Sequence, residues 1–90
     1  MKNYQKEYEL RQANLDAWII REFRVALQNA ERALEAHDMR NFEFFLGTAC
    51  EALGLRNEFA SSEDIIPQYM IKRYEQLVIM PCIVTEEAIA

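Results

Sequence analysis

The sequence has few residues that break helices. Its 90 residues include only two glycines and two prolines. The first glycine is Gly47 and the first proline is Pro67, so the long stretch before them holds no strong breaker. Two isolated glycines cannot form the glycine-rich loop that cradles a phosphate. No run of about 18 uncharged apolar residues occurs, so we expect no membrane-spanning helix.

Residues that carry chemistry are equally scarce, with one histidine and two cysteines. His37 lies only two residues from Glu35, a spacing that points two helical side chains apart, and a second ligand-bearing helix is missing. Cys50 and Cys82 show no CxxC spacing, and nothing places either beside His37 for nucleophilic catalysis. We expect reduced, buried and inert thiols. The chain is therefore predicted to be no enzyme and to bind no metal or cofactor.

Length and composition favour a single folded domain that comprises residues 1–90. The hydrophobic fraction of 51% and aromatic fraction of 11% are enough for a packed core. The first residues lack the continuous apolar segment of a signal peptide. We expect a cytoplasmic protein.

The net charge of −5 is unevenly distributed. Residues 1–36 hold six basic and six acidic side chains, whereas residues 37–90 hold four basic and nine acidic ones. The acidic density peaks at Glu58, Glu63 and Asp64. Such a field repels nucleic-acid phosphates and anionic lipids, and it favours a partner protein with a basic surface.

Apolar residues recur at helical spacing from residue 3 to residue 36, which predicts one long amphipathic helix. A helix of that length spans roughly 50 Å, far more than a compact domain of this size. One end should therefore overhang, and we predict that Tyr4, Tyr8 and Leu15 form the interface of a homo-oligomer, in the simplest case a dimer. A kink within residues 12–14 is the alternative.

A second helix is predicted from Met39 to Leu53. Asp38 is suited to cap its first turn, and Gly54 to end it in a left-handed conformation. Gly47 lies inside this helix, which predicts the close approach of another backbone.

A third helix is predicted after the cap-rich segment 61–64. Pro67 should lie in its first turn, Ile66, Met70, Tyr74 and Leu77 should face inward, and Pro81 should end the helix after Met80. Residues 82–84 would then be extended and residues 86–90 would form a short appendage. A β-strand over residues 77–85 is the alternative. The predicted fold is all-α, a small three-helix bundle, or a four-helix one if the appendage packs.

Several large apolar residues fall outside these buried stripes. Trp18 and Val25 lie together off the stripe of the first helix, and Phe44 lies on the charged side of the second. Exposed apolar groups surrounded by charge are typical of a protein–protein surface, in which aromatic anchors dominate. Alternatively, the loop and the C-terminal segment bury Trp18 and Phe44. The predicted partner-binding residues are Trp18, Val25, Phe44, Glu51, Glu58, Glu63 and Asp64.

The sequence thus favours a non-enzymatic interaction protein that occupies a partner's surface, as an inhibitor, an immunity-type neutraliser, a secretion chaperone or an adaptor. Two alternatives remain. Residues 52–55 resemble the turn of a DNA-binding helix-turn-helix, although the carboxylates that follow would repel DNA. A self-assembling structural subunit would instead bury Trp18, Phe44 and Tyr8 between identical chains.

Overall fold

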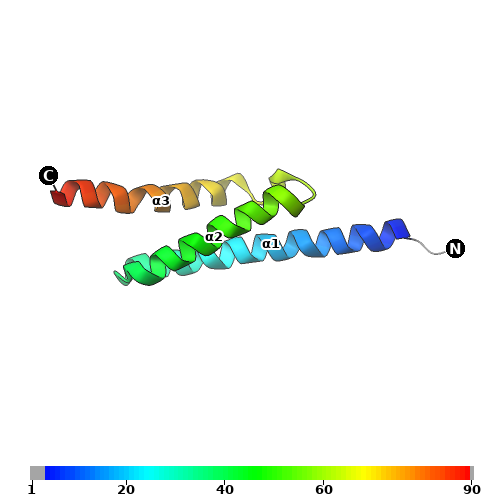
Figure 1. The fold of residues 1–90 in the computed structure, drawn as a ribbon, viewed down its shortest axis with the longest axis horizontal. Coiled ribbons are helices and arrows are strands. Elements are labelled where there is room, and N and C mark those ends of the chain that lie inside the picture. Colours follow the sequence, from blue (N-terminus) through cyan, green and yellow to red (C-terminus); the bar gives the residue numbers. More distant parts are fainter. Residues whose placement is uncertain (1–3, 90) are drawn as a thin grey trace.

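The computed structural model describes the backbone of residues 4–89 and the side chains of residues 4–79. Over this range the chain forms three α-helices and one 3-10 turn and no strand (Figure 1). The elements are α1 (Tyr4–Glu35), α2 (Met39–Phe59), η1 (Glu63–Ile65) and α3 (Gln68–Ile89). The predicted all-α class, a three-helix bundle with a long first helix, is confirmed.

A tight turn at His37 and Asp38 folds α2 back against α1. The His37 N–H donates to the Leu34 carbonyl at 3.0 Å, and the Asp38 N–H donates to the Ala33 carbonyl at 2.8 Å. These two bonds form a Schellman motif, which needs a left-handed residue, and His37 takes that place with φ 56°. The Asp38 carboxylate then accepts the Asn41 N–H at 3.2 Å. The predicted cap of the second helix is confirmed.

The core lies mainly between α1 and α2. Its four largest fully buried side chains are Phe23, Phe42, Ile19 and Leu27. Small residues fill the remaining contacts and let the two helices approach each other closely. The inner faces match the stripes predicted from helical periodicity. Besides the four large side chains, the buried apolar residues of this pair are Ala26, Ala30, Ala33, Ala49 and Ala52.

Helix α1 is continuous through residues 12–14, so the alternative of a kink there is wrong. The molecule is 69 Å long but only 19 by 17 Å across, with a radius of gyration of 16.6 Å. A compact chain of this length would have about 12 Å. Tyr4 and Tyr8 lie on the overhang and are 68% and 66% exposed. Leu15 is partly buried against the core, so it is not part of the overhang.

Both glycine predictions for α2 are wrong. The helix passes through Gly54 and ends at Phe59, and neither glycine has a positive φ. A Cβ atom added at Gly47 would meet nothing within 4 Å, so no backbone of the described chain approaches it. A helix-interior glycine costs only about 1 kcal/mol, and burial of the neighbouring Ala52 and partial burial of Leu53 and Leu55 outweigh that cost.

The connection to α3 uses the predicted cap-rich segment. The Asp64 N–H donates to the Ser62 hydroxyl at 3.1 Å, which begins η1, a 3-10 turn that the sequence did not predict. The Pro67 carbonyl accepts the Met70 N–H at 3.0 Å, so Pro67 stands directly before α3. Its missing N–H does no harm there.

Helix α3 continues to Ile89 and contains Pro81. The predicted end at Met80, the extended segment 82–84, the separate appendage and the alternative strand over 77–85 are therefore wrong. Proline removes one helical hydrogen bond and commonly kinks a helix without ending it.

Helix α3 packs on the α1–α2 hairpin through a short stretch of its surface. Met70 and Leu77 are buried, and the Tyr74 ring lies 5.8 Å from the Phe23 ring between centroids. Arg73 forms an ion pair with Glu31 of α1. These contacts confirm the predicted inward face of α3, and they place α3 on one side of the hairpin.

Candidate interaction surface

The thiol at Cys50 is exposed, contrary to the prediction of a buried one. It lies at the edge of α2 next to Tyr74 of α3. Burial raises the pKa of the Tyr74 hydroxyl above its usual 10, and its contact with Cys50 adds to this effect. No base or carboxylate accompanies the thiol in these contacts. The side chain of Cys82 lies outside the described residues.

The carboxylates around His37 do not gather into a site. Within residues 4–79, no group of three or more His, Cys, Asp or Glu side chains is placed to hold a metal ion. Glu31 instead pairs with Arg73. Among the helices of the described chain, none is long and apolar enough to cross a membrane.

Large apolar side chains remain exposed where the sequence predicted them. Trp18 is 41% exposed, Val25 44% and Phe44 65%. The alternative, in which the loop and the C-terminal segment bury Trp18 and Phe44, is therefore wrong. The Phe44 ring packs edge-on against the ring of the partly buried Phe45, with centroids 5.3 Å apart.

Trp18 and Val25 project from the side of α1 that faces away from α3. They are one heptad apart and so lie in one column of the helix. Two α1 residues that contact α3 are Phe23 and Glu31. Successive residues of a helix are rotated by about 100° around its axis. Around the axis of α1, the mean direction of the Phe23 and Glu31 side chains is therefore roughly 170° from that of Trp18 and Val25, on the opposite side of the helix.

Phe44, Glu51 and Glu58 form a second column, on α2. They are spaced by seven residues, and all three are exposed. Cys50, which touches α3, projects roughly 100° away from this column. Thr48 and Leu55 project close to Phe44 and are only partly exposed, because they lie on the flank turned toward α1.

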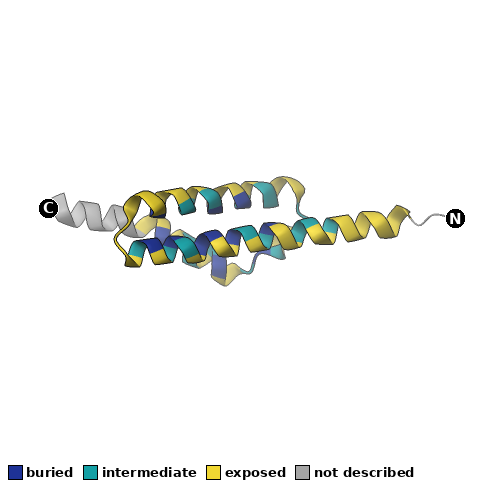
Figure 2. Ribbon diagram, turned by 90° about the horizontal axis from the view of Figure 1, so that it is seen from below, coloured by how far each residue is buried: buried dark blue, intermediate teal, exposed yellow. Residues whose placement is uncertain are grey.

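Both columns therefore lie on sides of their helices that α3 does not cover. Figure 2 looks onto the hairpin with α1 and α2 in front and α3 behind them. We call this surface, formed by Trp18, Val25, Phe44, Glu51 and Glu58, the hairpin face. These are five of the seven predicted partner-binding residues.

Glu63 and Asp64 are exposed in η1 and lie apart from the hairpin face. The chain enters this segment through Ser61, whose N–H donates to the Asp16 carboxylate at 3.0 Å. Asp16 projects roughly 170° from Trp18 and Val25, on the side of α3. The three acidic residues at which the acidic density of the sequence peaks therefore do not lie together. Only Glu58 belongs to the hairpin face.

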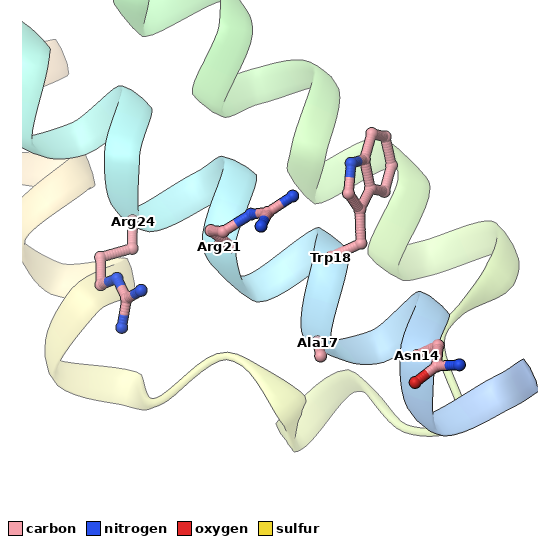
Figure 3. Close-up of a pocket in the computed structure, with 5 residues that line it drawn as sticks. All are labelled: Asn14, Ala17, Trp18, Arg21 and Arg24. Atoms are coloured by element: carbon pink, nitrogen blue, oxygen red, sulfur yellow. The ribbon is translucent and has the colours of Figure 1, made fainter. Parts of the chain in front are cut away.

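Beside Trp18, α1 carries a shallow depression of ≈ 450 Å³ that sequence reasoning missed. Figure 3 shows the indole rising from α1 toward α2, the Arg24 side chain extending the opposite way and Arg21 between them along α1. Neither arginine has a carboxylate three or four residues away in the sequence, and neither forms an ion pair with another described residue. The lack of a carboxylate at these positions could have been recognised from the sequence. The complete lining is Asn14, Ala17, Trp18, Arg21 and Arg24.

The borders of the hairpin face carry opposite charges. Arg21 projects about 50° from the direction of Trp18 and Val25 and makes that border of α1 basic, whereas the α2 column is acidic through Glu51 and Glu58. Arg24 projects close to Glu31, on the side of α3. The exposed large apolar side chains of this face are Trp18, Val25 and Phe44. This arrangement suits recognition of a protein surface, because it combines aromatic anchors with a charged rim.

Comparison with known protein families, curated proteins and solved structures finds no match for this chain.

Proposed function

We propose that this protein is a non-enzymatic interaction module that acts by occupying the surface of a partner protein. The observation that carries the proposal is the hairpin face, on which Trp18, Val25 and Phe44 stay exposed although the chain has a third helix that could have covered them. Inhibitors, immunity-type neutralisers, secretion chaperones and adaptors all work in this way.

The exposed side chains of this face are large enough to supply binding energy. Burying a fully exposed aromatic or branched side chain is worth about 1.5–3 kcal/mol, so the half-exposed Trp18 and Val25 each supply about half of that. Phe44 supplies more, since it is 65% exposed. The charged residues nearby, Arg21 on α1 and Glu51 and Glu58 on α2, would give the interface an orientation as well as affinity.

The acidic border of α2 supports a partner that is basic where it meets Glu51 and Glu58. The chain's net charge of −5 favours the approach of such a surface. Dimerisation through the overhang is a separate proposal, supported by the exposure of Tyr4 and Tyr8 beyond the end of α2.

The self-assembling subunit remains a second candidate because of the same overhang. The DNA-binding alternative is not retained, because residues 52–55 lie inside the continuous helix α2 and form no turn between two helices.

Affinity capture from the source lysate tests the proposal, with the tagged protein compared with its Phe44→Asp variant. The matched control is Tyr69→Asp, because Tyr69 is 61% exposed on α3 and lies outside the hairpin face. We expect a stoichiometric protein that is captured by the wild type and the control and is lost with Phe44→Asp. Light scattering on each bait reports its own mass.

Capture that is equal for all three baits would contradict the proposal. An empty capture by a dimeric bait that Phe44→Asp converts to a monomer would instead establish the self-assembling subunit.

A further inference from the structure

We infer that two copies of this chain pack antiparallel through the overhang of α1, related by a two-fold axis, and that the dimer presents both hairpin faces on one side. The overhang is the segment Tyr4–Arg11, which extends past the end of α2 (Figure 1). The dimer proposed above thereby has a defined orientation. The use of its two hairpin faces rests on the proposed function.

The overhang continues the stripe of α1 that α2 covers. Helix α2 ends beside Gln12, whose side chain donates to the Phe59 carbonyl at 2.9 Å. Tyr8 and Ala26 are 18 positions apart, which is about five helical turns, so they project in the same direction from α1. Ala26 is only 2% exposed, whereas the described chain leaves Tyr8 66% exposed (Figure 2). The overhang therefore has a face that is suited to pack against one more helix.

A second copy fits this face because the overhang is complementary to itself. Tyr4 and Gln12 are equally far from Tyr8 along α1. If two antiparallel overhangs meet at Tyr8, each one begins where the α2 helix of the other copy ends. Tyr4 of one copy then lies near Phe59 of the other, and Phe59 is 51% exposed. One contact thus covers three exposed aromatic residues of each copy.

The charges of the overhang also fit a second copy, although the whole chain carries −5. The overhang holds two basic and two acidic residues, so its own charge is balanced. Glu7 and Arg11 are four residues apart and lie on the same flank of α1. Antiparallel packing about Tyr8 brings this flank of both copies together, so that Glu7 of each copy lies close to Arg11 of the other. Two equivalent ion pairs result, as a two-fold interface requires.

The same symmetry determines where the hairpin faces point. Trp18 projects from α1 between the directions of Glu7 and Arg11, on the same flank. A two-fold axis that relates two antiparallel helices is perpendicular to both, and it keeps corresponding flanks on the same side. Both Trp18 side chains therefore lie on one side of the dimer. They are roughly 30 Å apart along the helix axis, because each lies ten residues from Tyr8.

Helix α3 does not obstruct this arrangement. Asp16, which binds Ser61 and so directs the chain toward α3, projects roughly 80° from Tyr8 on the flank opposite Trp18. Both α3 helices therefore lie on the other side of the dimer. Dimerisation leaves the two hairpin faces open and pairs them for a partner that offers two equivalent sites.

Analytical ultracentrifugation of the full chain tests the interface with one variant and one matched control. The control is Leu10→Asp, because Leu10 is 63% exposed on the same overhang but projects roughly 160° away from Tyr8. We expect the wild type and Leu10→Asp to form dimers of similar affinity. Tyr8→Asp should dimerise at least about tenfold more weakly, because it places two carboxylates at the two-fold axis. Circular dichroism checks that both variants remain folded.

Disulfide cross-linking tests the orientation, in a chain whose two native cysteines are replaced by serine. In the antiparallel dimer, Tyr8→Cys places two thiols together at the axis. Tyr4→Cys places them about 12 Å apart along the helices, which is too far for a disulfide. We expect a cross-linked dimer from Tyr8→Cys and none from Tyr4→Cys. A parallel dimer would cross-link through both positions.

Four results would overturn the inference. They are a monomeric wild type at millimolar concentration, equal weakening of the dimer by Leu10→Asp and Tyr8→Asp, equal cross-linking through Tyr4→Cys and Tyr8→Cys, and a dimer that Phe44→Asp dissociates. If the inference fails through any of the first three, the Phe44-dependent capture still occurs. If the proposed function alone fails, the antiparallel dimer forms and that capture is missing.

Discussion

Asp16, in the middle of α1, accepts hydrogen bonds from both the backbone N–H and the hydroxyl group of Ser61, a residue 45 positions further along the chain. The neighbouring Gln12 donates to the Phe59 carbonyl at 2.9 Å. The first helix thus fixes the point at which α2 ends and the chain turns toward α3. These contacts lie opposite the hairpin face, so they position α3 without covering Trp18.

Replacing Asp16 by Ala should lower stability by about 1 kcal/mol at neutral pH, because hydrogen bonds to an ionised group are lost from a partly exposed site. The hydrogen bond from the Ser61 hydroxyl holds the pKa of Asp16 below its usual 3.8. The stabilisation is therefore present above the unfolded-state pKa and is lost as pH falls through the folded-state pKa. Urea denaturation of the wild type and of Asp16→Ala, repeated from pH 7 down to acid pH, checks this prediction. The difference in unfolding free energy between the two proteins should shrink as the pH falls. A constant difference at all pH values would mean that the ionised form has no special role.

His37→Gly should stabilise the protein by about 1 kcal/mol. His37 has φ 56°, a left-handed conformation that costs a side-chain-bearing residue roughly 1–2 kcal/mol and costs glycine little. Part of the gain is offset by the greater freedom of glycine in the unfolded chain. His37→Ala is the control, because it removes the imidazole ring but keeps the Cβ atom, and it should give no such gain. Thermal unfolding followed by circular dichroism measures both variants, and equal gains would show that the imidazole itself is the unfavourable group.

Gly47→Ala and Gly54→Ala should each raise the free energy of unfolding by about 0.5–1 kcal/mol. Both glycines lie inside α2, and an added Cβ atom would meet nothing within 4 Å at either position. Alanine therefore gains helix propensity without a clash. Chemical denaturation gives the two values. If either variant is destabilised, a neighbouring chain approaches that glycine in solution, which a change of melting temperature with protein concentration would reveal.

Local periodicity was enough to predict the helices, the cap at Asp38 and the exposure of Trp18, Val25 and Phe44, because these depend on residues a few positions apart. It failed at Gly54 and Pro81, because a single breaker costs only about 1–3 kcal/mol and the flanking residues can override it. The contact of Asp16 with Ser61 joins residues too distant in sequence for any periodic pattern to reveal. Whether α3 covers the predicted site residues depends on the side of the hairpin on which α3 packs. No local pattern in the sequence predicts that side.

Measurements of stability can distinguish a residue of the hairpin face from a residue of the core. Two phenylalanines that are two residues apart on α2 provide the comparison. Phe44 is 65% exposed, whereas Phe42 is 1% exposed and lies between α1 and α2. Phe44→Asp should leave helicity and the melting temperature nearly unchanged, because the carboxylate stays in water. Phe42→Asp places a charge in the core at a cost of several kcal/mol, which is comparable to the whole stability of a domain of this size, and it should unfold the chain. Circular dichroism of both variants at one protein concentration checks the pair. A large loss of helicity in Phe44→Asp would show that Phe44 is covered in solution by residues of the same chain or of a second copy, and it would remove the side chain on which the interaction surface chiefly depends.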